Sequence, residues 1–379
     1  MRRRPQARTL RDMTLRCQLS LGGRTVPLLD RARIYTCGIT PYDVTHLGHA
    51  ATFVWADALS RVLRALDVEP ITCRNVTDVD EVLDVAAWRA GSEYDRFAAI
   101  QQFEFEGDMA ALNVRPPEHE PRAHRYVDAV ARLAGALLTT GDAYTRGGSV
   151  YFRGRAVVRA SGLDVGRARA LAGEYGGRLD DPAKEDPFDV AVWQAAEPDH
   201  PEWESPWGPG RPGWHAECVA MSLSAFGVGV DFHAGGADLA FPHHAYHRAM
   251  AEAVTGVRPY ARAWLHAGTV TVDGAKMAKS AGNLVRVEDL LAAAPAAVVR
   301  MMILDRPWAR DWDYTPELLE VAADRVDRLY RAAARPGGGD ADETLGLLSR
   351  DLDVTAAVDL ATDVGGASAR RLASVLGLA

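Results

Sequence analysis

The chain has 379 residues, a hydrophobic content of 48% and a formal net charge of −8 at pH 7. This length and composition allow two or three domains, each with its own hydrophobic core. The acidic balance argues weakly against a dedicated nucleic-acid-binding protein, although an acidic protein can still hold a local basic patch. Four cysteines lie far apart in the chain, which favours free thiols or metal ligands in a reducing compartment over a disulfide framework: Cys17, Cys37, Cys73 and Cys218.

Neither end of the chain nor its interior suggests a membrane partner. The basic start, Met1-Arg-Arg-Arg-Pro, is followed by no apolar stretch, so no secretory signal is expected. No segment approaches the roughly 18 consecutive apolar residues of a membrane span. We therefore expect a soluble, cytoplasmic protein.

The first elements form a predicted βαβ unit. Residues 32–39 are β-prone, apolar residues at helical spacing predict a helix from about His49 to Leu66, and residues 69–76 predict a second strand. A strand, a helix and a strand within about 45 residues indicate two parallel strands connected by a crossover helix. The expected fold class is therefore α/β, with a parallel sheet covered by helices.

The rest of the chain divides by composition. Residues 141–204 are rich in Gly, Pro and charged residues, contain a hairpin-like piece at 147–154, and belong to a predicted insertion between two halves of the sheet. From about Val287 onward the chain looks all-helical, with a flexible break at 336–342. The expected units are a first half of the nucleotide-binding domain (1–110), an insertion (111–205), a second half (206–286) and a helical region (287–379).

Two motifs suit the binding of a triphosphate. His46-Leu-Gly-His49 opens the first predicted helix, where free N–H groups and the helix dipole favour phosphate, and Gly48 leaves room for a nucleotide. Lys276-Met-Ala-Lys279-Ser places two lysines where they can follow the β- and γ-phosphates as pyrophosphate leaves.

Each motif alone is weak. The first can be a pair of ordinary histidines at a helix start, and the second can be a solvated loop. Their order and their separation of about 230 residues are much more specific. No G-x-x-x-x-G-K-[ST] motif is present, which excludes a P-loop mechanism.

A third group of residues has the chemistry of a zinc site. Cys37 ends the first strand, Cys218 begins a helix, and His243 and His247 are four residues apart on one helix face. Cysteine and histidine are the preferred ligands of zinc, and a site with an open position can accept a substrate. Taken alone, these residues favour buried structural thiols and surface histidines, because the spacing of cysteines so far apart indicates nothing by itself.

The motifs together resemble those of cysteinyl-tRNA synthetases over about residues 30–290. The matching segments are Cys37-Gly-Ile-Thr-Pro-Tyr-Asp-Val-Thr-His-Leu-Gly-His49, Asn75-Val-Thr-Asp-Val-Asp80, Gly210-Arg-Pro-Gly-Trp-His-Ala-Glu-Cys218, Gly235-Gly-Ala-Asp238 with Pro242-His-His244, and Lys276-Met-Ala-Lys-Ser280. Within that superfamily, Gly38-Ile-Thr-Pro-Tyr-Asp43 looks more like the cysteine ligases of mycothiol biosynthesis. The resemblance implies the Rossmann-like sheet of class I synthetases, an inserted connective domain and a short C-terminal helical bundle.

The resemblance also implies roles for single residues. Cys37, Cys218 and His243 would bind zinc, and the thiolate of substrate cysteine would complete the tetrahedron. Thr40, Trp214 and Asp238 match positions that hold the substrate's ammonium group. The residues His46, Gly48, His49, Lys276 and Lys279 would act on ATP and its Mg²⁺.

Three departures from the family's pattern affect the assignment of these roles to residues of this chain. The tRNA enzymes place a glutamate where this chain has His247, which is therefore an uncertain fourth ligand. Ala278 replaces a serine between the two lysines, and Ala237 replaces a serine before Asp238. The second replacement puts the contact with the substrate amine in more doubt than the metal.

The C-terminal stretch favours a small acceptor over tRNA. Residues 338–379 contain no aromatic residue and three arginines, whereas an anticodon reader needs a basic surface with stacking side chains. We therefore expect ATP-dependent activation of cysteine and its transfer to the amine of glucosaminyl-inositol. The alternatives are a truncated cysteinyl-tRNA synthetase or paralogue that uses tRNA or another amine, and an inactive synthetase-like binding protein.

Overall fold

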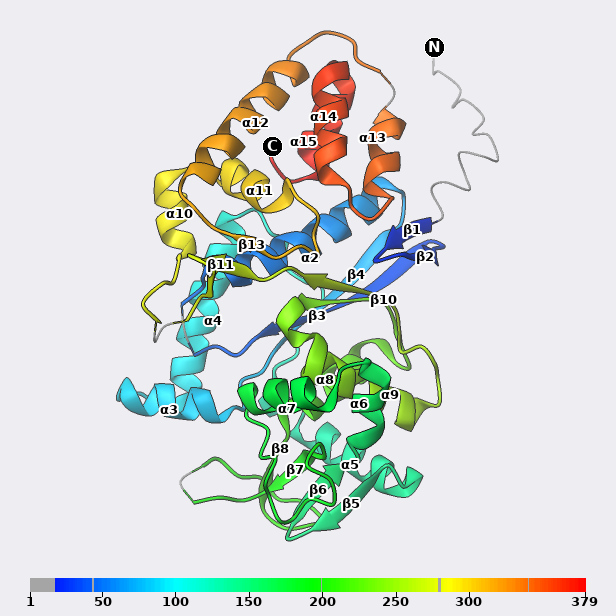
Figure 1. Ribbon diagram of the computed structural model, residues 1–379, viewed down its shortest axis with the longest axis vertical. Coiled ribbons are helices and arrows are strands. Elements are labelled where there is room, and N and C mark those ends of the chain that lie inside the picture. Colours follow the sequence, from blue (N-terminus) through cyan, green and yellow to red (C-terminus); the bar gives the residue numbers. More distant parts are fainter. Residues whose placement is uncertain (1–17, 43, 199, 279–280, 340) are drawn as a thin grey trace.

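A four-stranded parallel sheet lies at the middle of the molecule, between a helical bundle and a smaller antiparallel sheet (Figure 1). The computed structural model describes residues 18–42, 44–198, 200–278, 281–339 and 341–379. The central sheet has the order β10-β9-β3-β4, and all its neighbouring strands are parallel. Its strands are β3 (Arg31–Ile39), β4 (Glu69–Val76), β9 (Val230–Gly236) and β10 (Ala261–Ala267). The predicted α/β fold class is therefore confirmed.

The predicted βαβ unit is confirmed as well. Helix α2 (Leu47–Ala65) connects β3 to β4, which are parallel neighbours. The helix begins two residues earlier than expected, because the side chain of His46 caps it by accepting a hydrogen bond from the Gly48 amide. The first motif therefore forms the N-terminus of the helix itself.

The two faces of the sheet bury two different cores. On β3, Ala32 and Ile34 belong to the core on the side of α2, whereas Tyr35 and Cys37 belong to the core on the opposite side. On β9, Phe232 belongs to the first core, and the next residue, His233, contacts the ring of Tyr35 on the second side. Because side chains alternate along a strand, the sequence of each strand decides which residues meet on the second face.

The order of the strands creates a binding place at one edge of the sheet. From β3 the chain continues to β4 on one side, while β9 and β10 extend the sheet on the other side. Ligands of open parallel sheets bind at the carboxyl ends of the strands at such a reversal of order. Here the carboxyl end of β3 leads to His46, and that of β9 leads to Asp238.

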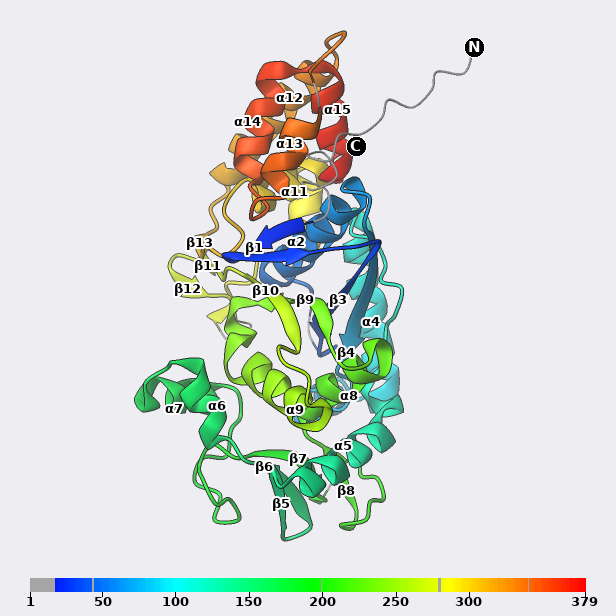
Figure 2. The ribbon, with the colours of Figure 1, turned by 90° about the vertical axis from the view of Figure 1, so that its right-hand side faces the viewer.

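The insertion forms the lower part of the molecule (Figure 2). Its antiparallel sheet has the order β5-β6-β7-β8, and the predicted hairpin is present with its turn at Gly147 and Gly148, both of which have positive φ. The last strand lies beyond residue 205. Helices α3 (Glu81–Arg89) and α4 (Tyr94–Ala111) precede the insertion in the chain. The elements of the lower part are α5 (Val127–Thr140), β5 (Ala143–Arg146), β6 (Ser149–Phe152), α6 (Arg155–Ser161), α7 (Val165–Glu174), β7 (Val190–Ala195) and β8 (Gly210–Pro212).

The C-terminal part is helical with one exception. Strand β13 (Trp312–Asp313) pairs in parallel with β11 (Val270–Val272), which also pairs with β12 (Ala275–Lys276). No helix in the described part of the chain is long and apolar enough to cross a membrane. The helices are α10 (Val287–Ala293), α11 (Ala296–Leu304), α12 (Glu317–Ala333), α13 (Ala341–Leu348), α14 (Val354–Val364) and α15 (Gly366–Val375), and the short strands β1 (Gln18–Leu21) and β2 (Arg24–Pro27) precede the sheet.

Candidate active site

The histidine motif and the lysine loop lie side by side. The rings of His46 and His49 stack with centroids 3.8 Å apart at the start of α2. A backbone bridge joins His46 to Arg286, which follows the lysine loop. A Cβ added at Gly48 would lie 3.6 Å from Cε of Met277, so the loop also reaches the start of the helix. The fold therefore brings together two motifs that are far apart in the sequence.

The start of α2 has the chemistry of a phosphate site. Nδ1 of His46 accepts the hydrogen bond of the Gly48 amide at 3.1 Å, so a neutral His46 ring carries its proton on Nε2 and can donate it. The first turn of α2 contains no acidic residue. The positive end of the helix dipole and the ring N–H of His46 can therefore face an anion.

On the second face of the sheet, buried sulfur and nitrogen atoms form a group that can hold a metal. Cys37 of β3, Cys218 of α8 (Trp214–Phe226) and His243 place their ligand atoms within 4.8 Å of one another. Cys218 lies in the second turn of α8, and not at its start as expected, because the helix already begins at Trp214. All three side chains are buried.

The surroundings of this group fit a zinc ion. Burial, together with Cys218, raises the pKa of the Cys37 thiol, and burial lowers the pKa of His243, so both groups are held uncharged by the protein alone. The Asn75 amide donates to Sγ of Cys218 at 3.5 Å, and Nδ1 of His215 lies 2.9 Å from Nδ1 of His243. Such partners orient metal ligands, and a set of two thiols and one imidazole is typical of zinc.

His247 belongs to a different group. It lies in α9 (Ala245–Thr255), whereas His243 lies in the turn Ala240–His244 before this helix. Cys37, His233 and His247 form a second set of ligand atoms within 4.8 Å, so the two groups share Cys37. Nε2 of His247 and Nδ1 of His233 are buried and have no hydrogen-bond partner within the described ranges. Sequence reasoning missed His233, although the alternation of β9 could have placed this imidazole on the second face.

Of the residues expected to bind an ammonium group, Trp214 contacts the metal-binding group. Trp214 stacks on the His243 ring with centroids 4.2 Å apart. Asp238 follows β9 in the 3-10 turn Ala237–Leu239, and its carboxylate accepts from Nζ of Lys276 at 3.1 Å. Thr40 follows β3 and shares a 2.8 Å hydrogen bond with Thr77. Lys279 lies outside the described residues.

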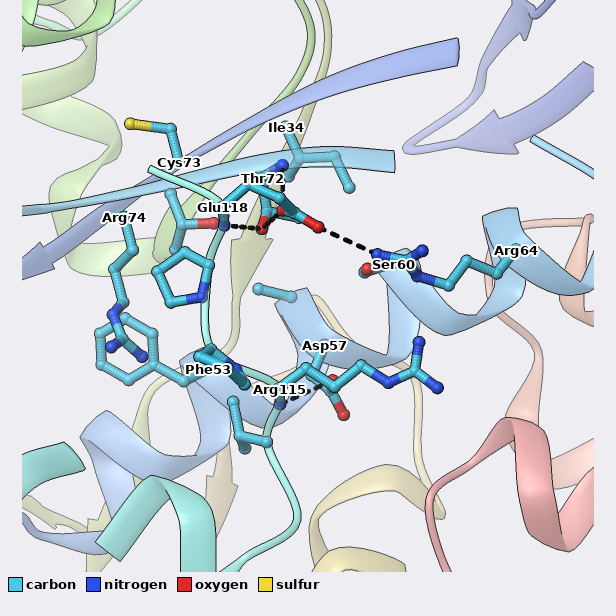
Figure 3. Close-up of a pocket in the computed structure, with 15 residues that line it drawn as sticks. Ile34, Phe53, Asp57, Ser60, Arg64, Thr72, Cys73, Arg74, Arg115 and Glu118 are labelled. Carbon is cyan, nitrogen blue, oxygen red and sulfur yellow. Dashed lines mark hydrogen bonds and ion pairs between the residues drawn. The ribbon is translucent and has the colours of Figure 1, made fainter. Parts of the chain in front are cut away.

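A separate pocket lies between α2, β4 and residues 114–118 (Figure 3). Arg64 pairs with Glu118 at 3.0 Å, and Glu118 also accepts from the Thr72 amide, so charges around this pocket satisfy each other. Among the residues that the structure describes, none that we assigned to ATP, ammonium or metal lines it. The pocket is therefore not part of the candidate active site.

Comparison with known proteins agrees with this architecture. The family described as "tRNA synthetases class I (C) catalytic domain" matches residues 26–324. Among solved structures, methionyl-tRNA synthetase of Mycobacterium tuberculosis bound by methionyl-adenylate gives a TM-score of 0.66 at 17% identity, covering 91% of this chain and 84% of that chain. The chain thus has the fold of class I synthetases and belongs to their family.

Curated relatives narrow the family. The chain is 41% identical over 336 residues to the L-cysteine:1D-myo-inositol 2-amino-2-deoxy-alpha-D-glucopyranoside ligase of Streptomyces griseus. This match covers 86% of this chain and 82% of that protein. The chain is 43% identical to the ligase of the same name from Kineococcus radiotolerans, covering 88% and 83%. The chain belongs to this ligase family, and the resemblance found in its motifs is thereby confirmed.

Proposed function

We propose that the protein activates L-cysteine with ATP to cysteinyl-adenylate and transfers the cysteinyl group to the amine of an inositol glucosaminide. The observation that carries this proposal is the thiol and imidazole group of Cys37, Cys218 and His243. Stacked rings of Trp214 and Tyr175 connect this group to Lys276 of the lysine loop, which pairs with Asp238. The names of the relatives contain the same two substrates.

In the first step, a carboxylate oxygen of cysteine attacks the α-phosphorus of ATP. The bond from this phosphorus to the bridging oxygen breaks, and pyrophosphate leaves with the electron pair. His46, His49 and the positive end of the α2 dipole bind the phosphates. Lys276 and, by its place in the motif, Lys279 offset the charge of the leaving pyrophosphate together with Mg²⁺.

The selection of cysteine rests on its sulfur. Cys37, Cys218 and His243 would hold a zinc ion, which would lower the pKa of the substrate's thiol at the remaining position. Serine offers a harder and much less acidic hydroxyl, so the same position discriminates against it. Asp238 and Trp214 bind the ammonium group of the amino acid through charge and a ring face.

In the second step, the amine of the acceptor attacks the acyl carbon of the adenylate. An amide bond forms, the bond to the phosphate oxygen breaks, and AMP leaves. The proton of the attacking amine passes to a base or to water.

Two measurements test the proposal. Cysteine-dependent exchange of pyrophosphate into ATP tests the activation, and an inactive binding protein would show none. Product analysis with glucosaminyl-inositol and tRNA offered together tests the acceptor. We expect the amide of the amino sugar, and charged tRNA without this amide would contradict the proposal.

A further inference from the structure

The ammonium group of Lys276 is held in a site made by two other parts of the chain. Its Nζ lies 3.1 Å from Oδ2 of Asp238 and 3.3 Å from the hydroxyl of Tyr175, and it lies 5.4 Å from the centre of the Tyr175 ring. Glu174 contributes a second carboxylate at 3.6 Å. A carboxylate, a hydroxyl and a ring face around one Nζ make a receptor for a primary ammonium ion.

This receptor is built by the insertion and the second half of the sheet. Tyr175 ends α7, which packs against the turn Ala240–His244, and its ring stacks on Trp214 with centroids 6.2 Å apart. Trp214 in turn stacks on His243. Three rings thus lead from the ammonium receptor to the metal-binding group.

The pKa shifts of Lys276 and Tyr175 agree with a receptor that is occupied by the charged Lys276 side chain. Burial disfavours the charged form of Lys276, but Asp238 and Tyr175 outweigh it and raise its pKa. Burial, followed by Asp238, raises the pKa of Tyr175 to about 12, so its hydroxyl keeps its proton. The receptor therefore holds a cation beside two carboxylates and a neutral phenol.

We propose that Tyr175 and Asp238 form the receptor of the substrate's ammonium group, and that Lys276 occupies it until the amino acid displaces this lysine toward ATP. Tyr175 is then a positioning residue for the amine. The inference rests on the proposed function, because it takes an amino acid as the substrate.

The competition follows from charge and space. Asp238 offers its Oδ2 to Lys276, and a second ammonium group at the same oxygen would repel the first. A released Lys276 remains in the loop beside the start of α2, where phosphates bind. Binding of the amino acid therefore makes this lysine available for the triphosphate, and the two substrates should assist each other's binding.

Binding of thiols without ATP tests the displacement. The zinc-loaded full-length protein and K276M are titrated calorimetrically with cysteine, cysteamine and 3-mercaptopropionate. If Lys276 fills the receptor nine-tenths of the time, its removal lowers the apparent Kd for cysteine and cysteamine about tenfold. The Kd for 3-mercaptopropionate should stay the same, because this thiol has no ammonium group. K276R keeps a cation in the loop and serves as the control, with affinities close to those of the wild type.

The role of Tyr175 is tested in a protein without Lys276, because this lysine competes with the substrate's ammonium group. In the K276M background, Y175A should raise the Kd for cysteine and cysteamine about threefold or more, while Y175F should recover part of this loss through its ring. An unchanged Kd for 3-mercaptopropionate in the same variants shows that the metal-binding group is intact.

The outcomes separate the inference from the proposed function. Unchanged or weaker cysteine binding by K276M, or equal tightening of all three thiols, would overturn the displacement. An effect of Y175A on all three thiols would remove the positioning role of Tyr175. If the wild-type protein binds no cysteine and shows no cysteine-dependent exchange, the proposed function itself fails, and the inference with it.

Discussion

The backbone amide of Leu47 donates a 2.8 Å hydrogen bond to the carbonyl of Val285. This bond joins the first turn of α2 to the segment after the lysine loop, and the Val287 amide returns a second bond to the carbonyl of Thr45. The histidine motif and the lysine loop are thus connected by the main chain itself. Side-chain substitutions in either motif can therefore change ATP chemistry without separating the two segments.

The first prediction concerns the metal. C218A should lose bound zinc and, with it, the preference for cysteine over serine in pyrophosphate exchange, because one of the two thiol ligands is gone. C73A is the matched control, since Cys73 is also a buried thiol near Cys218 but belongs to neither ligand group. Elemental analysis of the purified variants gives the zinc content. Full zinc in C218A, or its loss in C73A, would contradict the assignment.

The second prediction separates the two groups that share Cys37. H243N should lose zinc, and H247N should retain it, because we place the ion with Cys218 and not with His233. Zinc content and the rate of zinc transfer to a coloured chelator measure this difference. The reverse result would move the ion to Cys37, His233 and His247.

The third prediction concerns the close contact of β3 and β4. A Cβ added at Gly38 would lie 1.6 Å from the carbonyl oxygen of Asn75, and a backbone atom cannot turn away from it. We expect G38A to lower the free energy of unfolding by about 2–3 kcal/mol and to weaken zinc binding, since Asn75 also contacts Cys218.

Urea unfolding with G107A as the control checks the effect on stability. Gly107 lies in α4 with open space around its Cα, and alanine there should raise the stability by about 0.5–1 kcal/mol. Equal stability of the two variants would show that the strands separate without strain.

The fourth prediction is a pH dependence. Burial lowers the pKa of His266 to about 4, opposed in part by Asp238, whereas an unfolded histidine titrates near 6.5. Between pH 6.5 and 4 the unfolded chain therefore binds a proton that the folded chain does not, and the stability falls as the pH falls.

Replacing this histidine removes its part of the effect. From pH 6.5 to 5, the free energy of unfolding of H266Q should fall less steeply than that of the wild type, by about 1 kcal/mol per pH unit. Urea unfolding at three pH values measures both slopes. Parallel curves would show that His266 is already protonated in the folded protein.

Much of the fold and the composition of the site could be predicted from local patterns. The βαβ unit followed from strand and helix periodicity, and the position of His46 and Gly48 at the start of α2 followed from the same helix pattern. These features depend on neighbours in the sequence. The strand β13 was not predicted, because it exists only through its pairing with β11 and the contacts of Asp313 with Thr271 and Gly274.

The residues that sequence reasoning missed depend on tertiary contacts. His233 meets Cys37 only because β9 lies next to β3, and nothing in its own segment marks it as a ligand. Tyr175 lies in a Gly- and charge-rich part of the insertion, and its role appears only where α7 reaches Trp214 and Lys276. The pairing of Lys276 with Asp238 likewise joins two motifs that seemed to serve different substrates.

The attachment of the lysine loop limits how far the ammonium group of Lys276 can move. The Asp313 carboxylate holds the Gly274 amide at 2.9 Å, only two residues before Lys276, and the bond between Leu47 and Val285 holds the other end. Two extended residues span at most about 7 Å, so the backbone between the fixed Gly274 amide and Lys276 can move only a short distance. Under the proposed function, the triphosphate must therefore bind within the length of one lysine side chain from residue 276.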